Sequence, residues 1–98
     1  MEFPILAQNI KLKSIEIDYE GKKYICKIEL IDNFMQASIF LNNELKYKGN
    51  IILEKLQSQI QTFLDYDINE IFEEINQLNF NNFSIKKEKR KFKLIIEI

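Results

Sequence analysis

This chain of 98 residues has few side chains that could take part in catalysis or bind a metal. The residue types that it lacks exclude several classes of catalytic and binding site. The sequence has no histidine, one cysteine (Cys26) and two glycines (Gly21 and Gly49). It therefore has no near-neutral general base of the usual kind, no Ser-His or Cys-His pair and no imidazole ligand. One cysteine cannot form a zinc cluster, and two glycines cannot form a phosphate-binding or dinucleotide-binding loop. We expect no catalytic residue, metal or cofactor, no small-molecule substrate, and a protein that is not an enzyme.

Acidic side chains gather around the second predicted helix and form the first candidate site. They lack the loop pattern of a calcium site, and acids at a helix N-terminus stabilise the helix through its dipole. We expect Asp67 to be the N-cap and Glu70 to complete a capping box. Helix stability is the favoured interpretation of the cluster. Its members are Asp65, Asp67, Glu70, Glu73 and Glu74.

A basic stretch near the C-terminus is the second candidate site. Folded as a hairpin, it would gather cations at one sheet tip, which suits nucleic acid or other phosphates, acidic protein tails and anionic headgroups. Glu88 interrupts it, and no exposed aromatic residue is expected between its cations for base stacking. Lysines at a hairpin tip also keep strand edges from pairing. A solvated face is therefore favoured over an anionic partner. The basic residues are Lys86, Lys87, Lys89, Arg90, Lys91 and Lys93.

Length and composition place both clusters in one domain spanning residues 1–98. Hydrophobic residues make up 46% and charged residues 30%, which is typical of globular proteins, and abundant Ile, Lys, Asn and Phe are typical of an AT-rich genome. The net charge of −1 gives no overall attraction to nucleic acid or membrane. The lone Cys26 favours a reducing compartment. We expect an intracellular protein of cytoplasm or nucleus, without a membrane partner, and with a loosely ordered leader at residues 1–9.

Hydrophobic periodicity predicts the elements that position these residues, in an α+β fold. Four segments alternate with a period of two and indicate an antiparallel meander, and apolar residues at helical spacing then indicate an α-hairpin. A C-terminal β-hairpin follows, which gives the order β-β-β-β-α-α-β-β in a sheet curled into a small sandwich or barrel. The predicted strands lie at 12–20, 24–30, 35–41, 45–51, 83–85 and 92–98, and the helices at 53–64 and 68–78.

A second apolar surface is expected on the sheet face opposite Ala37 and Ile39. Phe34 and Phe40 point to that side of their strand, and Ile25, Ile31 and Ile95 are expected to join them. Two apolar faces need two covers. Closure of the sheet into a sandwich is the favoured cover, and a protein partner is the alternative.

The element order resembles the globular heads of centriole-assembly and DNA-end-joining coiled-coil proteins. The resemblance covers residues 12–98 and implies a dimerising β-sandwich with a scaffold role, without implying any functional residue. Those heads have more strands after the helices, and this chain stops at Ile98 inside an apolar strand. We therefore expect it to be the N-terminal part of a longer protein.

These observations together predict a non-enzymatic domain for protein–protein interaction and assembly. Its candidate interface comprises Phe34, Phe40 and the acidic cluster, and copies could associate head to tail through the oppositely charged clusters. The alternative is an anion-binding module that uses the hairpin at 86–93. Nucleic acid is the less favoured partner.

Overall fold

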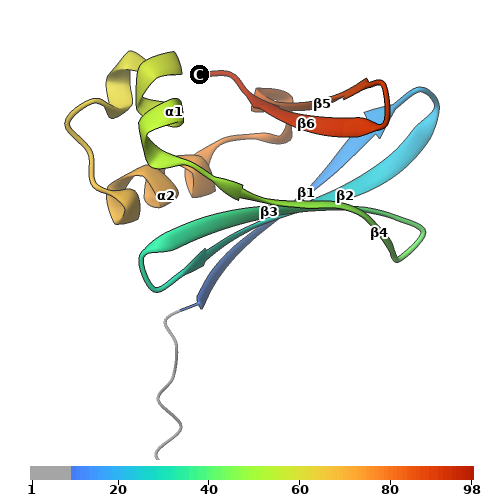
Figure 1. The fold of residues 1–98 in the computed structure, drawn as a ribbon, viewed down its shortest axis with the longest axis horizontal. Coiled ribbons are helices and arrows are strands. Elements are labelled where there is room, and N and C mark those ends of the chain that lie inside the picture. Colours follow the sequence, from blue (N-terminus) through green and yellow to red (C-terminus); the bar gives the residue numbers. More distant parts are fainter. Residues whose placement is uncertain (1–9) are drawn as a thin grey trace, which may run out of the picture.

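The computed structural model describes residues 10–98, and the leader expected at residues 1–9 lies outside them. Helices and strands follow one another in the predicted order (Figure 1). A four-stranded antiparallel sheet comes first, then two helices, each followed by a short 3-10 turn, then a two-stranded hairpin. The strands are β1 (Ile10–Tyr19), β2 (Lys22–Ile31), β3 (Phe34–Leu41), β4 (Glu44–Ile51), β5 (Phe83–Glu88) and β6 (Lys91–Ile96). The helices are α1 (Leu53–Gln59) and α2 (Ile68–Gln77), and the 3-10 turns are η1 (Gln61–Phe63) and η2 (Phe80–Asn82).

Tight turns fix the register of the sheet, whose strand order is β1-β2-β3-β4. Glu20 and Gly21 have φ angles of 50° and 74°, and Asn42 and Asn43 have 52° and 65°. Two consecutive residues in the left-handed region give the turn whose twist matches that of the paired strands. Glycine and asparagine tolerate this conformation best, which explains why the sequence predicted both turns.

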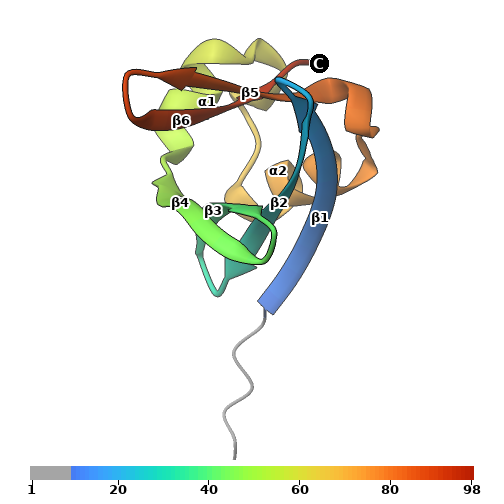
Figure 2. The ribbon, with the colours of Figure 1, turned by 90° about the vertical axis from the view of Figure 1, so that its right-hand side faces the viewer.

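The inner face of the sheet carries the core. Cys26, Ile28 and Ile39 are fully buried on it, and the helices contribute Phe63 and Phe72, also fully buried. The β5-β6 hairpin adds inward side chains to the same cluster, with Phe83, Ile85 and Phe92 at most 8% exposed. Figure 2 shows the helices and the hairpin together on the concave side of the curved sheet. Within residues 10–98, the four-stranded sheet is thus covered on one side only.

The first helix is shorter than the sequence predicted. Residues 53–64 have apolar residues at helical spacing, but α1 ends at Gln59, and Ile60 is extended with φ −122° and ψ 100°. The chain then re-forms as a 3-10 turn that buries Phe63 completely and leaves Leu64 59% exposed. Burial of one large aromatic side chain outweighs continuation of a short helix, because isolated helices of this length are marginal.

The second helix begins as predicted. The Asp67 carboxylate accepts a hydrogen bond from the Glu70 N–H at 2.8 Å, and the Asp67 N–H donates to Glu70 Oε1 at 3.1 Å. At the other end, Lys13 of β1 donates to the carbonyls of Asn76 and Leu78 at 2.9 and 3.0 Å. A cation at a helix C-terminus satisfies carbonyls that have no partner within the helix and complements its dipole. These contacts attach α2 to the first strand. No helix within residues 10–98 has the length and apolar character needed to cross a membrane.

Replacing Lys13 with methionine should lower the free energy of unfolding by about 1–2 kcal/mol, because two helix carbonyls lose a charged donor. Lys11→Met is the matched control. It removes a half-exposed ion pair with Glu73 at 2.8 Å and should cost less than about 1 kcal/mol. Urea unfolding of both variants measures the difference. Equal losses would show that the Lys13 bonds contribute no more than a surface ion pair.

Candidate functional site

The predicted basic hairpin forms, but it distributes its cations over different sides. Lys86 and Lys93 lie opposite each other in the β5-β6 pairing and flank Glu88, whose two carboxylate oxygens lie 3.4 and 3.3 Å from their Nζ atoms. Hydrogen bonds from Lys93 and Lys86 hold the pKa of Glu88 below its usual range. Lys87 points to the other side, with Nζ 5.5 Å from the centre of the Phe92 ring.

The turn of this hairpin carries the remaining cations. Lys89 takes a left-handed φ of 58°, and Arg90 and Lys91 follow it, all three exposed. Within residues 10–98 none of the three has an ion-pair partner. The structure therefore brings together a three-residue basic tip, while Glu88 offsets the charge of the lysines behind it.

The predicted acidic cluster is mostly occupied with contacts inside the protein. Asp67 and Glu70 form the capping box, and Glu73 pairs with Lys11. The side chains of Asp65 and Glu74 make no hydrogen bond or ion pair with another described residue. Among residues 10–98, no group of three or more His, Cys, Asp or Glu side chains is arranged to hold a metal ion.

Cys26 is a core residue. Its side chain is fully buried, and burial raises the pKa of the thiol to about 12 because the thiolate would lose its hydration. The thiol is therefore protonated at neutral pH and inaccessible to reagents. Cys26 therefore serves as a small apolar residue of the core.

Phe34 and Phe40 lie on the outer face of the sheet, opposite the core. Each belongs to a row of neighbouring side chains that crosses three strands. The strand pairings place Ile10, Ile31 and Phe34 side by side in one row and Ile25, Phe40 and Leu45 in the other. We call these two sets the outer rows.

The outer rows are uncovered in the part of the chain that the structure describes. Ile10, Phe34 and Leu45 are 53%, 43% and 49% exposed, and Leu12 beside the first row is 53% exposed. Figures 1 and 2 show both helices and the hairpin on the other side of the sheet. Closure of a sandwich over this face, which the sequence favoured, does not occur among residues 10–98. Ile95, which was expected here, lies on the hairpin instead, because β5 and β6 also cover the inner face.

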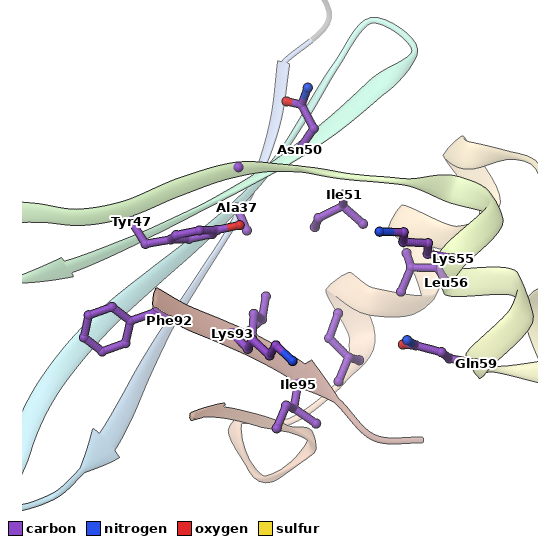
Figure 3. A pocket seen from close by; sticks show the side chains of 13 residues that line it. Ala37, Tyr47, Asn50, Ile51, Lys55, Leu56, Gln59, Phe92, Lys93 and Ile95 are labelled. Atoms are coloured by element: carbon purple, nitrogen blue, oxygen red, sulfur yellow. The ribbon is translucent and has the colours of Figure 1, made fainter. Parts of the chain in front are cut away.

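A groove opens where the hairpin meets the sheet, between β4 and β6. Figure 3 shows its lining side chains, with α1 at one end and Tyr47 at the other. We call this cavity of about 450 Å³ the seam groove. The opposite seam is closed by Tyr19 of β1, whose hydroxyl accepts a hydrogen bond from the N–H of Lys87 of β5 at 3.1 Å. The groove is lined by Ala37, Tyr47, Gly49, Asn50, Ile51, Lys55, Leu56, Gln59, Phe92, Lys93, Leu94, Ile95 and Ile96.

Gly49 shapes the floor of this groove. A Cβ atom at Gly49 would collide with the Tyr47 hydroxyl and lie 2.8 Å from its Cζ. The Tyr47 ring therefore lies along its own strand over the glycine, which is possible only because Gly49 has no side chain. The position of this glycine, on the apolar side of its strand, is a signal of a bulge or of a close approach by another group. The bulge of this strand pair lies beside Ile39 and Phe40, whereas Gly49 pairs in register with Ala37, so Gly49 marks the close approach and not the bulge.

Gly49→Ala should lower the free energy of unfolding by about 1–3 kcal/mol in the natural chain, because the Tyr47 ring must leave its position. In a Tyr47→Ser background, the same substitution should be neutral or stabilising, since alanine loses less backbone entropy on folding than glycine. Urea unfolding of the four proteins gives the coupling energy. An identical effect of Gly49→Ala in both backgrounds would contradict the contact.

Comparison of the chain with protein-family models, curated protein sequences and solved structures gives no match. The resemblance of the element order to coiled-coil-protein heads therefore stays a prediction. The features of the molecule that bear on its function are the basic tip, the outer rows and the seam groove.

Proposed function

We propose that this chain is a non-enzymatic interaction domain that associates with a second copy of itself through the outer face of its four-stranded sheet. The main support for this proposal is the pair of outer rows. They place apolar side chains in contact with solvent on a face that no described element covers. Exposed apolar patches of this kind mark interaction sites in soluble proteins. The association would be an assembly function, as the composition and the missing catalytic groups also favour.

The arrangement of the outer rows favours a second copy as the partner. The rows lie toward opposite ends of the face and are separated by two cross-strand rows. One is polar and contains Ser14, Lys27, Ser38 and Lys48, and the other is polar except for Leu12 and contains Glu29, Gln36 and Asn50. A twofold axis in the plane of the contact brings each apolar row onto an apolar row, whether the axis runs along the strands or across them. Such a face is complementary to itself, as a twofold dimer requires.

Charge on the outer face is also compatible with a second copy. Glu16 and Glu29 alternate in this face with Lys27 and Lys48, so neither sign dominates. The Lys27 Nζ lies 5.1 Å from the centre of the Phe40 ring, where the cation is attracted by the ring face and its stem covers apolar surface. Mixed charge limits repulsion between two like faces.

The size of the face sets the expected strength. Four strands about 4.8 Å apart and about eight residues long, at about 3.3 Å per residue, span on the order of 500 Å². Stable interfaces bury about 800 Å² of accessible surface per partner. A contact smaller than this should give a weak dimer, with a dissociation constant between about 1 µM and 1 mM.

Sedimentation equilibrium should show this dimer in the natural chain and its loss in a Phe34→Thr/Phe40→Thr variant. Threonine keeps strand propensity while removing two aromatic side chains from the outer rows. Leu64→Thr is the matched control, because Leu64 is 59% exposed but follows η1 in the helical segment on the covered side. Its dimer should be unchanged. A natural chain that stays monomeric at 1 mM, or a double variant that dimerises equally well, would contradict the proposal.

The basic tip supports anion binding as the second candidate function. Lys89, Arg90 and Lys91 are exposed together at the hairpin turn. If the tip binds phosphates, Lys89→Glu/Arg90→Glu/Lys91→Glu should reduce the salt concentration needed for elution from a heparin column. Charge reversal of Lys22, Lys23 and Lys46 changes the net charge equally at other turns and should leave elution almost unchanged. Equal shifts for both triple variants would remove this candidate.

A further inference from the structure

We propose that the seam groove binds an extended segment of a partner protein, which adds as a strand to the open edge of β6 and alternates apolar residues with carboxylates. This binding would use a surface separate from the outer rows. Binding in the groove can therefore be tested independently of self-association through the sheet face.

The backbone of β6 offers the first support, because half of its peptide groups point into the groove. Hydrogen-bonded and non-hydrogen-bonded pairs alternate along an antiparallel hairpin. The Glu97 N–H donates to the Asn82 carbonyl, and the Lys87 N–H points away from β6 to the Tyr19 hydroxyl. In the observed register, these two bonds show that Phe92, Leu94 and Ile96 belong to the non-hydrogen-bonded pairs with β5. Their N–H and C=O groups therefore point to the other edge of β6, which faces β4.

These groups have no strand partner among the described residues. The β5-β6 hairpin is a two-stranded sheet, and β4 pairs with β3 alone, so two strand edges face each other across the groove without being joined. A strand edge that presents a row of open donors and acceptors is a template for another extended segment. The groove provides space of about 450 Å³ for the side chains of such a segment.

The groove floor favours apolar side chains on one side of the added strand. Those side chains would lie level with Phe92, Leu94 and Ile96, which point toward the core side of the hairpin. Figure 3 shows Ala37 and Ile51 on the opposite wall, and Gly49 also lines the groove, so this wall offers small or apolar groups. Burial of β-branched side chains there would add to the backbone hydrogen bonds.

Charge favours carboxylates on the other side of the added strand. Lys55 of α1 and Lys93 of β6 line the groove, and no acidic residue does. Lys93 lies on the side of β6 away from the core, level with the outward side chains of an added strand, where a carboxylate would compete with Glu88, whose Oε2 lies 3.3 Å from the Lys93 Nζ. Lys55 is exposed and has no ion-pair partner within residues 10–98. Opposite charges across neighbouring strands stabilise the pairing and select its partner.

The test uses a synthetic seven-residue peptide in which valine alternates with glutamate, with blocked ends, titrated into the isotope-labelled chain at low protein concentration. Strand addition predicts that hydrogen exchange slows at the amides of Phe92, Leu94 and Ile96, while Lys93 and Ile95, already bonded to β5, change little. A peptide N-methylated at alternate amides keeps every side chain and should not bind. A lysine-for-glutamate peptide should bind at least tenfold more weakly.

A charge variant tests the specificity separately. Lys55→Glu should weaken the glutamate peptide about threefold or more and strengthen the lysine peptide. Lys22→Glu, which makes the same change in the β1-β2 turn, should have no effect.

Three results would overturn the proposal. They are no binding of the glutamate peptide at millimolar concentration, equal binding of the N-methylated peptide, and slowed exchange at Phe92, Leu94 and Ile96 that appears on raising protein concentration without peptide. The last result would show that a second copy fills the groove. The sedimentation experiment tests the outer face alone, and the peptide titration tests the groove alone. A negative result in one of them therefore contradicts one proposal and leaves the other unaffected.

Discussion

The structure depends on one constraint: a single four-stranded sheet has one face that must be removed from water, and everything after Ile51 serves that purpose. Cys26, Ile28 and Ile39 are fully buried, and they share a cluster with Phe63 and Phe72 of the helical segment. The hairpin does not lie beside the sheet or behind it, but over the same inner face (Figure 2). Within residues 10–98, the helices and the hairpin all cover the inner face, which explains why none of these elements covers the outer face.

The cover is attached unevenly, which accounts for the groove. On the β1 side, Tyr19 bonds to the backbone of β5 and Lys13 bonds to the end of α2. On the β4 side, α1 is short and ends at Gln59, so it fills only one end of the space between β4 and β6. One seam is therefore joined by hydrogen bonds, and the other keeps open strand edges with lysines beside them. Both proposed binding surfaces are consequences of how the inner face is covered.

Much of the fold could be predicted from the sequence, because local signals agree with the final structure. Period-two alternation and the Asn42-Asn43 turn gave the meander, and Asp67 with Glu70 gave the start of α2. The end of α1 could not be predicted, since burial of Phe63 is a tertiary effect. Nor could the side on which the hairpin packs: alternation shows that Phe83 and Phe92 need a cover, but it does not choose between two sheet faces.

The candidate sites were predictable to a similar degree. The outward direction of Phe34 and Phe40 follows from alternation, whereas the exposure of their rows depends on where the hairpin lies. The acidic cluster is mainly a helix start, as dipole and capping arguments indicated. The groove is lined by three segments that are distant in sequence, so the sequence does not predict it. Its one local signal is Gly49, whose position indicates a close approach of another group.

The most direct measurement of the central claim is solvent relaxation enhancement by a soluble gadolinium chelate, read at the methyl groups of Ile10, Ile25 and Ile31. In dilute solution these methyl groups should relax strongly, while those of the buried Ile28 and Ile39 should not. As protein concentration rises through the dimer range, the outer methyl groups should become protected. Protection at every concentration would show that the chain covers this face itself, and exposure at every concentration would show that no second copy does.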